Sequence, residues 1–196
     1  LSTLQDPEVW KATERWEGET EEVWLKTTLA NETELGLAFT HEEPWTRAVK
    51  EHVNSYRDLP FSAYHFAQKF RNELRAKSGL MRGREFVMKD LYSFGKNEEE
   101  LNSFYEDARV AYENVFKRVG IGNVTYLTVA SGGLFSKWSH EFQCVSDAGE
   151  DTIYIDTEKR LAVNKEVYTD DVLRDLGFDK EKLIEDWTKA YNFEFN

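Results

Sequence analysis

Two aromatic-rich runs joined by a short, glycine-containing loop constrain the fold more than any other feature of the sequence. The runs are "AYHFAQKFRNEL" at 63–74 and "EFVMKDLYSF" at 85–94, and the loop "RAKSGLMRG" between them contains Gly79 and Gly83. Aromatic residues favour strands, and glycine suits the turn that joins two strands. The sequence therefore predicts a strand–loop–strand unit over 63–94.

This hairpin carries positive charge in an acidic chain. The whole sequence has 25 Lys and Arg against 37 Asp and Glu, a net charge of −12, whereas Lys69 to Lys89 contain seven basic and two acidic side chains. The acidic total disfavours broad, non-specific binding of nucleic acid. Because the planar guanidinium of Arg binds phosphate or carboxylate at two points, the loop suits a local anion site. An ordinary solvated hairpin with surface Arg and Lys is the open alternative.

The remaining elements favour an α+β fold with an antiparallel sheet flanked by helices. Apolar residues recur at three- and four-residue steps over 97–119, which predicts the longest helix. Asp6 and Pro7 predict the start of a short helix, and a turn at Asn31-Glu32 predicts a hairpin within 21–40. Other expected strands are 124–130, 139–146 and 151–156, and other expected helices follow Pro44 and cover 169–187.

Several classes of protein are disfavoured by what the sequence lacks. No apolar run approaches the roughly 18–20 residues that cross a membrane, and the first residues do not resemble a signal peptide. The single Cys144 cannot form an internal disulfide and is expected to be buried. The four His are scattered, so we expect no metal-ligand cluster. These features predict a cytoplasmic protein without a membrane or DNA partner.

The basic hairpin resembles motif 2 of the class II aminoacyl-tRNA synthetases. That motif reads F-R-x-E, a loop, then R-x-x-x-F, and residues 70–86 of this chain match it. The longer string "KFRNELRAKSGLMRGREFVMKDLYSF" is similar to prolyl-tRNA synthetases in particular, as are "THEEPWTRAVKEHVNSYRDLPF" and "ASGGLFSKWSHEFQCVSDAGEDTIY". The resemblance covers nearly the whole chain. The matching motif residues are Arg71, Glu73, Arg82 and Phe86.

The resemblance implies that the chain activates proline with ATP to give prolyl-adenylate and pyrophosphate. Arg71 would bridge the α-phosphate and the substrate carboxylate as the catalytic residue. Glu73 would accept a hydrogen bond from the adenine amino group, Arg82 would reach the outer phosphates, and Phe86 would stack on adenine. Mg²⁺ would accompany ATP in the substrate complex, with no tightly bound cofactor. Because Arg71 and Glu73 are two residues apart, their side chains are expected to share one face of a strand.

Proline recognition is expected in "FTHEE", which resembles the family's T-x-E loop at Thr40 and Glu42. Charged proline is a secondary ammonium with two N–H donors, and a hydroxyl and a carboxylate offer two acceptors. Taken without the resemblance, the residues favour a helix N-terminus capped by Thr40, with the Glu residues facing the helix dipole, and both roles can hold together. The resemblance places His140 by the same pocket, and Asp90 is a further expected lining residue. "ASGG" at 130–133 would let the backbone approach a ligand closely.

Three parts of the family pattern have no counterpart in the sequence: motif 1, the glycine-rich motif 3 and the anticodon-binding domain. Residues 1–196 are therefore expected to be a partial class II catalytic domain. The family form is a homodimer that transfers proline to the 3′ end of tRNA(Pro), whereas a chain without motif 1 is expected to be monomeric. Two alternatives stay open: a catalytically inactive ATP- and proline-binding paralogue, and an RNA-contacting module that uses the hairpin alone.

Overall fold

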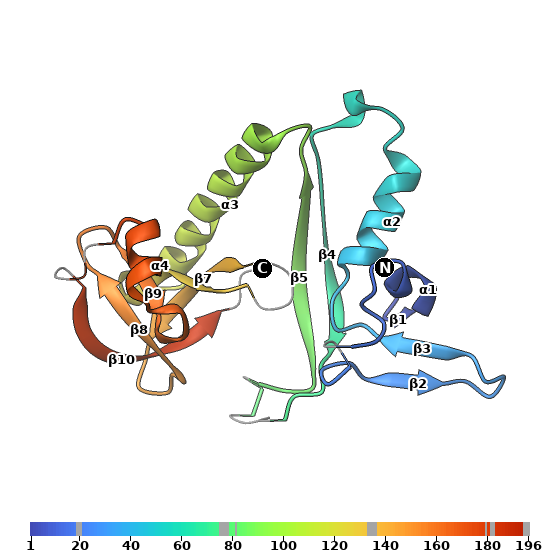
Figure 1. Ribbon diagram of the computed structural model, residues 1–196, viewed down its shortest axis with the longest axis horizontal. Coiled ribbons are helices and arrows are strands. Elements are labelled where there is room, and N and C mark those ends of the chain that lie inside the picture. Colours follow the sequence, from blue (N-terminus) through green and yellow to red (C-terminus); the bar gives the residue numbers. More distant parts are fainter. Residues whose placement is uncertain are drawn as a thin grey trace. The chain divides into compact units, whose positions relative to one another are not determined.

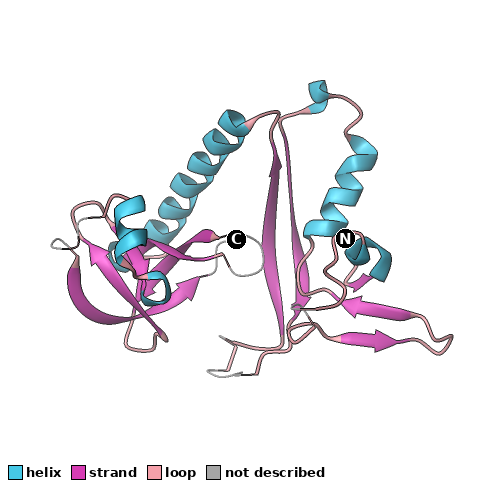
Figure 2. Ribbon diagram, viewed as in Figure 1, coloured by secondary structure: helices cyan, strands magenta, loops and turns pink. Residues whose placement is uncertain are grey.

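The chain divides into two compact units, residues 1–106 and 107–196. The computed structural model describes residues 1–18, 21–74, 79–80, 82–132, 137–178, 180 and 183–193. Helices and strands are interspersed in each unit (Figures 1 and 2). Among the described residues, every strand pair is antiparallel except that of β6 with β9. The predicted α+β class is confirmed. The described strands form three separate sheets where the sequence suggested one.

The first unit begins with a short helix and a three-stranded sheet. α1 (Pro7–Lys11) starts where predicted, because the Asp6 side chain accepts a hydrogen bond from the Glu8 backbone N–H. β2 (Lys26–Thr28) and β3 (Glu34–Leu37) form the predicted antiparallel hairpin, and β1 (Leu4–Gln5) adds to its other edge, giving the order β1-β3-β2.

Four large aromatic side chains form the core beside this sheet. Trp10, Trp16, Trp24 and Phe39 are all buried, and Trp24 packs edge-to-face on both other indoles with ring centroids 4.7 and 4.8 Å apart. The Trp24 indole N–H donates to the Leu37 carbonyl. This core fixes the chain that runs from β3 toward residue 40.

The predicted hairpin is a pair of ten-residue strands, β4 (Phe61–Phe70) and β5 (Glu85–Phe94). α2 (Glu42–His52) lies alongside β4 in Figure 1, and its Trp45 ring contacts those of His65 and Tyr92. One face of the hairpin is therefore covered by α2. The helix begins at Glu42, two residues before the predicted limit, since Pro44 is tolerated in a first turn. One 3₁₀ turn, Tyr56–Asp58, joins α2 to β4.

The second unit is built around a closed five-stranded barrel in the order β10-β7-β6-β9-β8. Its core residues include Ile153, Val163 and Phe142, and Phe116 of α3 packs against Phe142. Cys144 is buried, as predicted. α3 (Glu98–Arg118) begins in the first unit and ends in the second. The other elements of the second unit are β6 (Thr125–Ser131), β7 (Trp138–Val145), β8 (Asp151–Asp156), β9 (Leu161–Asn164), α4 (Asp170–Asp175) and β10 (Ile184–Phe193), with 3₁₀ turns at Gly122–Val124 and Lys165–Val167.

The predicted helix over 169–187 is wrong for its second half. α4 ends at Asp175, Gly177 follows with a left-handed φ of 68°, and Ile184 already belongs to β10. Glycine in this conformation commonly ends a helix. β10 then pairs with both β7 and β8, so tertiary pairing decides the state of this segment.

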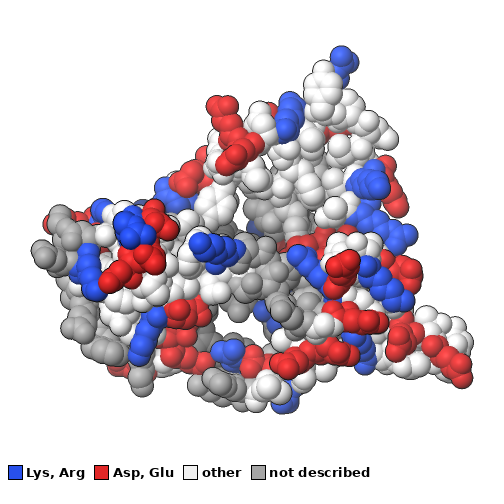
Figure 3. Space-filling view, viewed as in Figure 1, with Lys and Arg blue, Asp and Glu red and all other residues white. Residues whose placement is uncertain are grey.

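The charged side chains are mixed on the face shown in Figure 3, where Lys and Arg alternate with Asp and Glu. Among the described residues, no helix has the length and apolar character needed to span a membrane.

Candidate functional site

Strand alternation on the β4–β5 hairpin separates a covered face from an exposed one. His65 and Lys69 lie on the covered face of β4, while Tyr64 and Phe66, the two neighbours of His65 in the chain, are exposed. His65 pairs directly with Asp90 of β5 in the strand register. Because residues two apart share a face, Tyr92 follows Asp90 on the covered side. Polar and titratable groups are thus gathered beneath α2.

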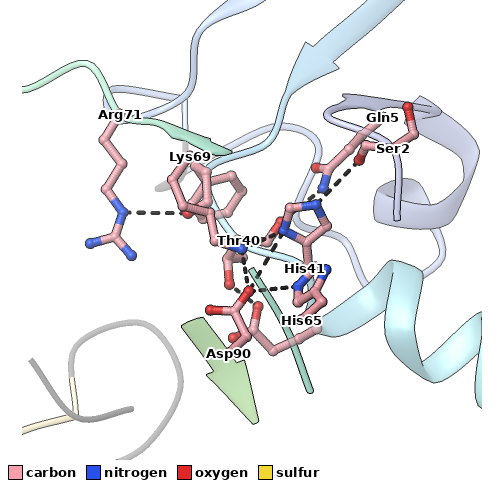
Figure 4. A network of polar contacts seen from close by, with 10 residues as sticks. Ser2, Gln5, Thr40, His41, His65, Lys69, Arg71 and Asp90 are labelled. Atoms are coloured by element: carbon pink, nitrogen blue, oxygen red, sulfur yellow. Dashed lines mark hydrogen bonds and ion pairs between the residues drawn. The ribbon is translucent and has the colours of Figure 1, made fainter. Parts of the chain in front are cut away.

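These groups form a continuous polar network, drawn in Figure 4. The Lys69 ammonium donates to Asp90 Oδ2 at 2.5 Å and to Nδ1 of His41, the residue just before α2. His65 Nε2 donates to the same Asp90 oxygen at 2.8 Å. Lys69 and His41 are completely buried. Direct contact with the partly buried Asp90 carboxylate offsets part of the hydration that the buried ammonium loses.

Burial changes the proton affinities of the network. The pKa of His41 is lowered to about 4, first by burial and then by the positive charge of Lys69. Burial likewise lowers the pKa of His65 and of Lys69, while Asp90 opposes both changes. The pKa of Tyr92 is raised by burial and by the negative charges of Glu42 and Asp90. His41 is therefore neutral near pH 7.

The fold brings together a group that the scattered His positions did not suggest. One ligand atom from each of His41, His65 and Asp90 lies within 4.8 Å of the others, which is the composition of a possible metal site. The Lys69 ammonium contacts two of these three residues, so a cation already stands among them. The ligand atoms of these three residues are therefore bonded within a network centred on Lys69 and Asp90.

The predicted substrate loop lies directly against this network. The Thr40 hydroxyl donates to the Glu42 carboxylate, and Thr40 is buried. His41, not Thr40, occupies the N-cap position of α2, and no side chain caps the helix there. The alternative in which Thr40 serves as the helix cap is therefore wrong. The Thr40 hydroxyl and the Glu42 carboxylate instead face each other.

The four motif 2 residues make two contacts between themselves. The Arg71 guanidinium carbon lies 5.6 Å from the Phe86 ring centroid, within cation–π range, and Arg71 Nε donates to the Phe39 carbonyl at 3.3 Å. Arg82 Nε donates to Glu73 Oε2 at 2.8 Å in an exposed ion pair. Arg71 thus connects the aromatic side chain of β5 to the segment that leads into Thr40.

The predicted shared strand face of Arg71 and Glu73 is wrong. β4 ends at Phe70, and the Glu73 backbone N–H donates to the Arg71 carbonyl at 2.8 Å. This tight turn at Asn72 breaks the strand alternation. Glu73 therefore points to Arg82 instead of lying beside Arg71.

Seven of the eight predicted site residues lie in the first unit, and His140 lies on β7 in the second. His140 pairs with Val129 of β6 in the register and is partly buried. The loop residues Arg75 and Lys77 and the last glycine of "ASGG", Gly133, lie outside the described residues.

Sequence reasoning missed four members of the site: His41, His65, Lys69 and Tyr92. Period-two alternation from Asp90 could have placed Tyr92 on the same face. For His65 and Lys69 the strand register was also needed, because only pairing with β5 shows which partner faces them. His41 comes from a separate element, and no local pattern links it to the hairpin.

Comparison with known proteins finds similarity over most of the chain. The tRNA synthetase class II core domain family (G, H, P, S and T) matches residues 24–194. A curated proline–tRNA ligase of Prochlorococcus marinus subsp. pastoris is 44% identical over 168 residues, and that of strain NATL2A is 39% identical over the same length. Each alignment covers 85% of this chain and 28% of the relative, so the chain spans just over a quarter of these proteins.

The fold also occurs in solved structures. A crystal structure described as the RNA binding domain of threonyl-tRNA synthetase from Cryptosporidium parvum Iowa II aligns with a TM-score of 0.58 and 22% identity. The alignment covers 66% of this chain and 31% of that one. At this identity the likeness supports the fold alone.

Proposed function

Because the chain belongs to the tRNA synthetase class II core domain family, we propose that it supplies the ATP- and proline-binding part of a proline–tRNA ligase. The curated relatives named proline–tRNA ligase at 39–44% identity support this choice within the family. The position of Arg71 is the structural observation that carries the proposal. It lies over the Phe86 ring and reaches back to the Phe39 carbonyl, next to Thr40.

In the proposed reaction, the proline carboxylate attacks the α-phosphorus of ATP. A carboxylate oxygen of proline forms a bond to the α-phosphorus. The bond between the α-phosphorus and the oxygen that bridges it to the β-phosphorus breaks, and pyrophosphate leaves with that electron pair. Negative charge spreads over the phosphoryl oxygens, so positioning and fixed cations supply most of the catalysis. Arg71 is assigned to the α-phosphate and the carboxylate together, since a guanidinium can donate to both.

The remaining motif 2 residues are assigned to the nucleotide. Phe86 would stack on adenine, Glu73 would accept from the adenine amino group, and Arg82 would bind the outer phosphates of MgATP, which enters as the substrate. The Glu73–Arg82 ion pair would open when the nucleotide binds. Such an exposed pair contributes only about 0–1 kcal/mol, so nucleotide contacts can replace it.

Proline is assigned to the side of Arg71 that reaches the Phe39 carbonyl, next to Thr40. Thr40 and Glu42 would accept the two N–H groups of charged proline, and the Glu42 carboxylate would add a counter-charge. Asp90 is proposed to line the pocket, and the proposal of His140 as a proline-binding residue rests on the family resemblance alone. The family also suggests three further parts of the proposal. The full-length protein would transfer proline to tRNA(Pro), form a homodimer and be located in the cytoplasm.

Proline-dependent ATP–pyrophosphate exchange tests the proposal in the protein at its full natural length. We expect Arg71→Ala to lower kcat/KM by about 10²–10³-fold, as removal of a group that stabilises transition-state charge does. Arg174→Ala is the matched control, since Arg174 is an exposed Arg on α4. Saturable proline binding without exchange would instead identify an inactive paralogue. RNA binding indifferent to ATP and proline would favour the RNA-contacting module.

A further inference from the structure

The segment that contains Thr40 and Glu42 is held from several sides. The Gln5 side-chain amide donates to the Thr40 carbonyl at 2.8 Å, and Arg71 Nε donates to the carbonyl of Phe39. The third anchor is the ring of His41, which separates Thr40 from Glu42 in the chain and is fully buried. The position of this ring therefore determines the direction in which its two neighbours point.

Both ring nitrogens of His41 have partners, which fixes its tautomer (Figure 4). Nε2 lies 3.2 Å from the Ser2 carbonyl. A carbonyl oxygen only accepts hydrogen bonds, so Nε2 carries the hydrogen and Nδ1 has a free lone pair. The donor to Nδ1 is the ammonium of Lys69. The ring is thus held at one edge by the N-terminal segment and at the other by β4.

Asp90 supplies the negative charge that makes a buried lysine tolerable. Lys69 is completely buried, and its ammonium lies 2.5 Å from Asp90 Oδ2, which also accepts from His65. An unpaired ammonium in this position would lose its hydration without compensation. With Asp90 in place, Lys69 keeps a proton to donate to His41.

We propose that Lys69 is a positioning residue that acts through His41, holding Thr40 and Glu42 in the arrangement that receives the cationic nitrogen of the substrate. This inference rests on the proposed function. It assigns roles to two residues that the motif resemblance leaves without one. Lys69 and His41 do not touch the substrate; they set where its two acceptors stand.

The test is a set of variants in proline-dependent ATP–pyrophosphate exchange, measured on the full-length protein well below its Tm. Lys69→Met and His41→Leu should each raise the KM for proline by about tenfold, the effect of one lost charge-assisted hydrogen bond. The KM for ATP should stay within about twofold. His41→Asn keeps an acceptor near the Nδ1 position and should rescue most of the loss. Lys89→Met is the matched control, because Lys89 lies on the exposed face of the same hairpin.

Two readouts separate positioning from a purely structural role. Lys69→Met and His41→Leu combined should raise the KM for proline no further than either change alone, since one residue acts through the other. Lys69→Met should lower Tm more than His41→Leu, because only the former leaves the Asp90 charge without its ammonium. The proline KM of these two variants should nevertheless rise equally.

Three results would overturn the inference while the proposed function stands: an unchanged proline KM in Lys69→Met, effects of the two changes that multiply, or KM values for proline and ATP that rise together in proportion to lost Tm. Absence of proline-dependent exchange in the unmodified protein is a different outcome. It would overturn the proposed function and this inference with it.

Discussion

His41 links the pH dependence of folding to the polar network. Its folded pKa is about 4, below the ordinary value of 6.5 that the unfolded chain has. Between these values the unfolded chain binds more protons than the folded one. Stability from this group is therefore complete above pH 6.5 and is lost as the pH falls toward 4. Burial lowers the pKa of His65 too, which adds a change of the same sign.

We expect the free energy of unfolding of the first unit to fall by roughly 2–3 kcal/mol between pH 7 and pH 4 on account of His41. Urea titrations followed by tryptophan fluorescence at several pH values measure it. His41→Gln should make the pH profile flatter, whereas His52→Gln, at the exposed end of α2, should not. An equally steep profile in His41→Gln would show that other groups carry the dependence.

A substitution at Gly36 tests how closely the tryptophan cluster (Trp10, Trp16, Trp24 and Phe39) is packed. A Cβ at this position would lie 2.6 Å from Cζ2 of the Trp24 ring, well inside van der Waals contact. Trp24 cannot withdraw, because Trp10 and Trp16 pack on it from two sides. We expect Gly36→Ala to destabilise the first unit by about 1–3 kcal/mol in urea unfolding. The comparison is Gly83→Ala, whose Cβ would meet nothing closer than 3.5 Å; equal losses in both variants would contradict the argument.

At the scale of elements, the sequence predicts the structure well where many residues favour the same state. The helix α3 was predicted from apolar residues at three- and four-residue steps over 97–119. The β4–β5 hairpin was predicted because aromatic residues favour strands and glycine suits the loop between them. The ends of the strands were less predictable. β4 ends before Arg71, and the turn that follows depends on a backbone hydrogen bond from Glu73 to Arg71 that no residue pattern predicts. The motif residues were found by resemblance, but the Lys69 network needed the pairing of strands.

β10 is the element that the sequence misassigned, and its barrel position can be tested. Ala190 pairs with Val145 of β7 and with Asp151 of β8, so its backbone N–H has a neighbouring strand whichever way it points. Ala190→Pro should destabilise the barrel by about 1–3 kcal/mol, because proline has no N–H and leaves a partner unsatisfied. Hydrogen exchange measures this effect: amide exchange in β7 and β8 should become faster in the variant.

The matched proline control lies in the turn between those two strands. Gly149 N–H donates to the Ser146 carbonyl, so Asp147 is the second residue of a four-residue turn, where proline is favoured. Asp147→Pro should leave amide exchange unchanged or slower. If Ala190→Pro behaves in the same way, residues 184–193 do not close the barrel in solution.

For the whole molecule, the binding proposal depends on local geometry rather than on overall charge. The chain carries a net charge of −12, and basic and acidic side chains are mixed on the face in Figure 3. Long-range attraction of an anionic nucleotide is therefore not expected from the total charge. Affinity would have to come from a few guanidinium groups at contact distance, such as those of Arg71, which lies over the Phe86 ring, and Arg82, which pairs with Glu73.

The two compact units also have separate cores, which predicts that they lose structure separately. The tryptophan cluster belongs to the first unit, whereas Ile153, Ile155 and Ala162 pack inside the barrel of the second.

Ile153 is completely buried, so Ile153→Ala should destabilise the barrel by about 2–5 kcal/mol. Amide exchange should accelerate throughout β6, β7, β8 and β9 while β4 and β5 keep their protection, because the hairpin does not depend on that core. Val110→Ala, at an exposed position of α3, should change neither set by more than about 0.5 kcal/mol. Equal acceleration in β4 and β5 would mean that both units unfold as one, and the tryptophan cluster would then owe part of its stability to the barrel.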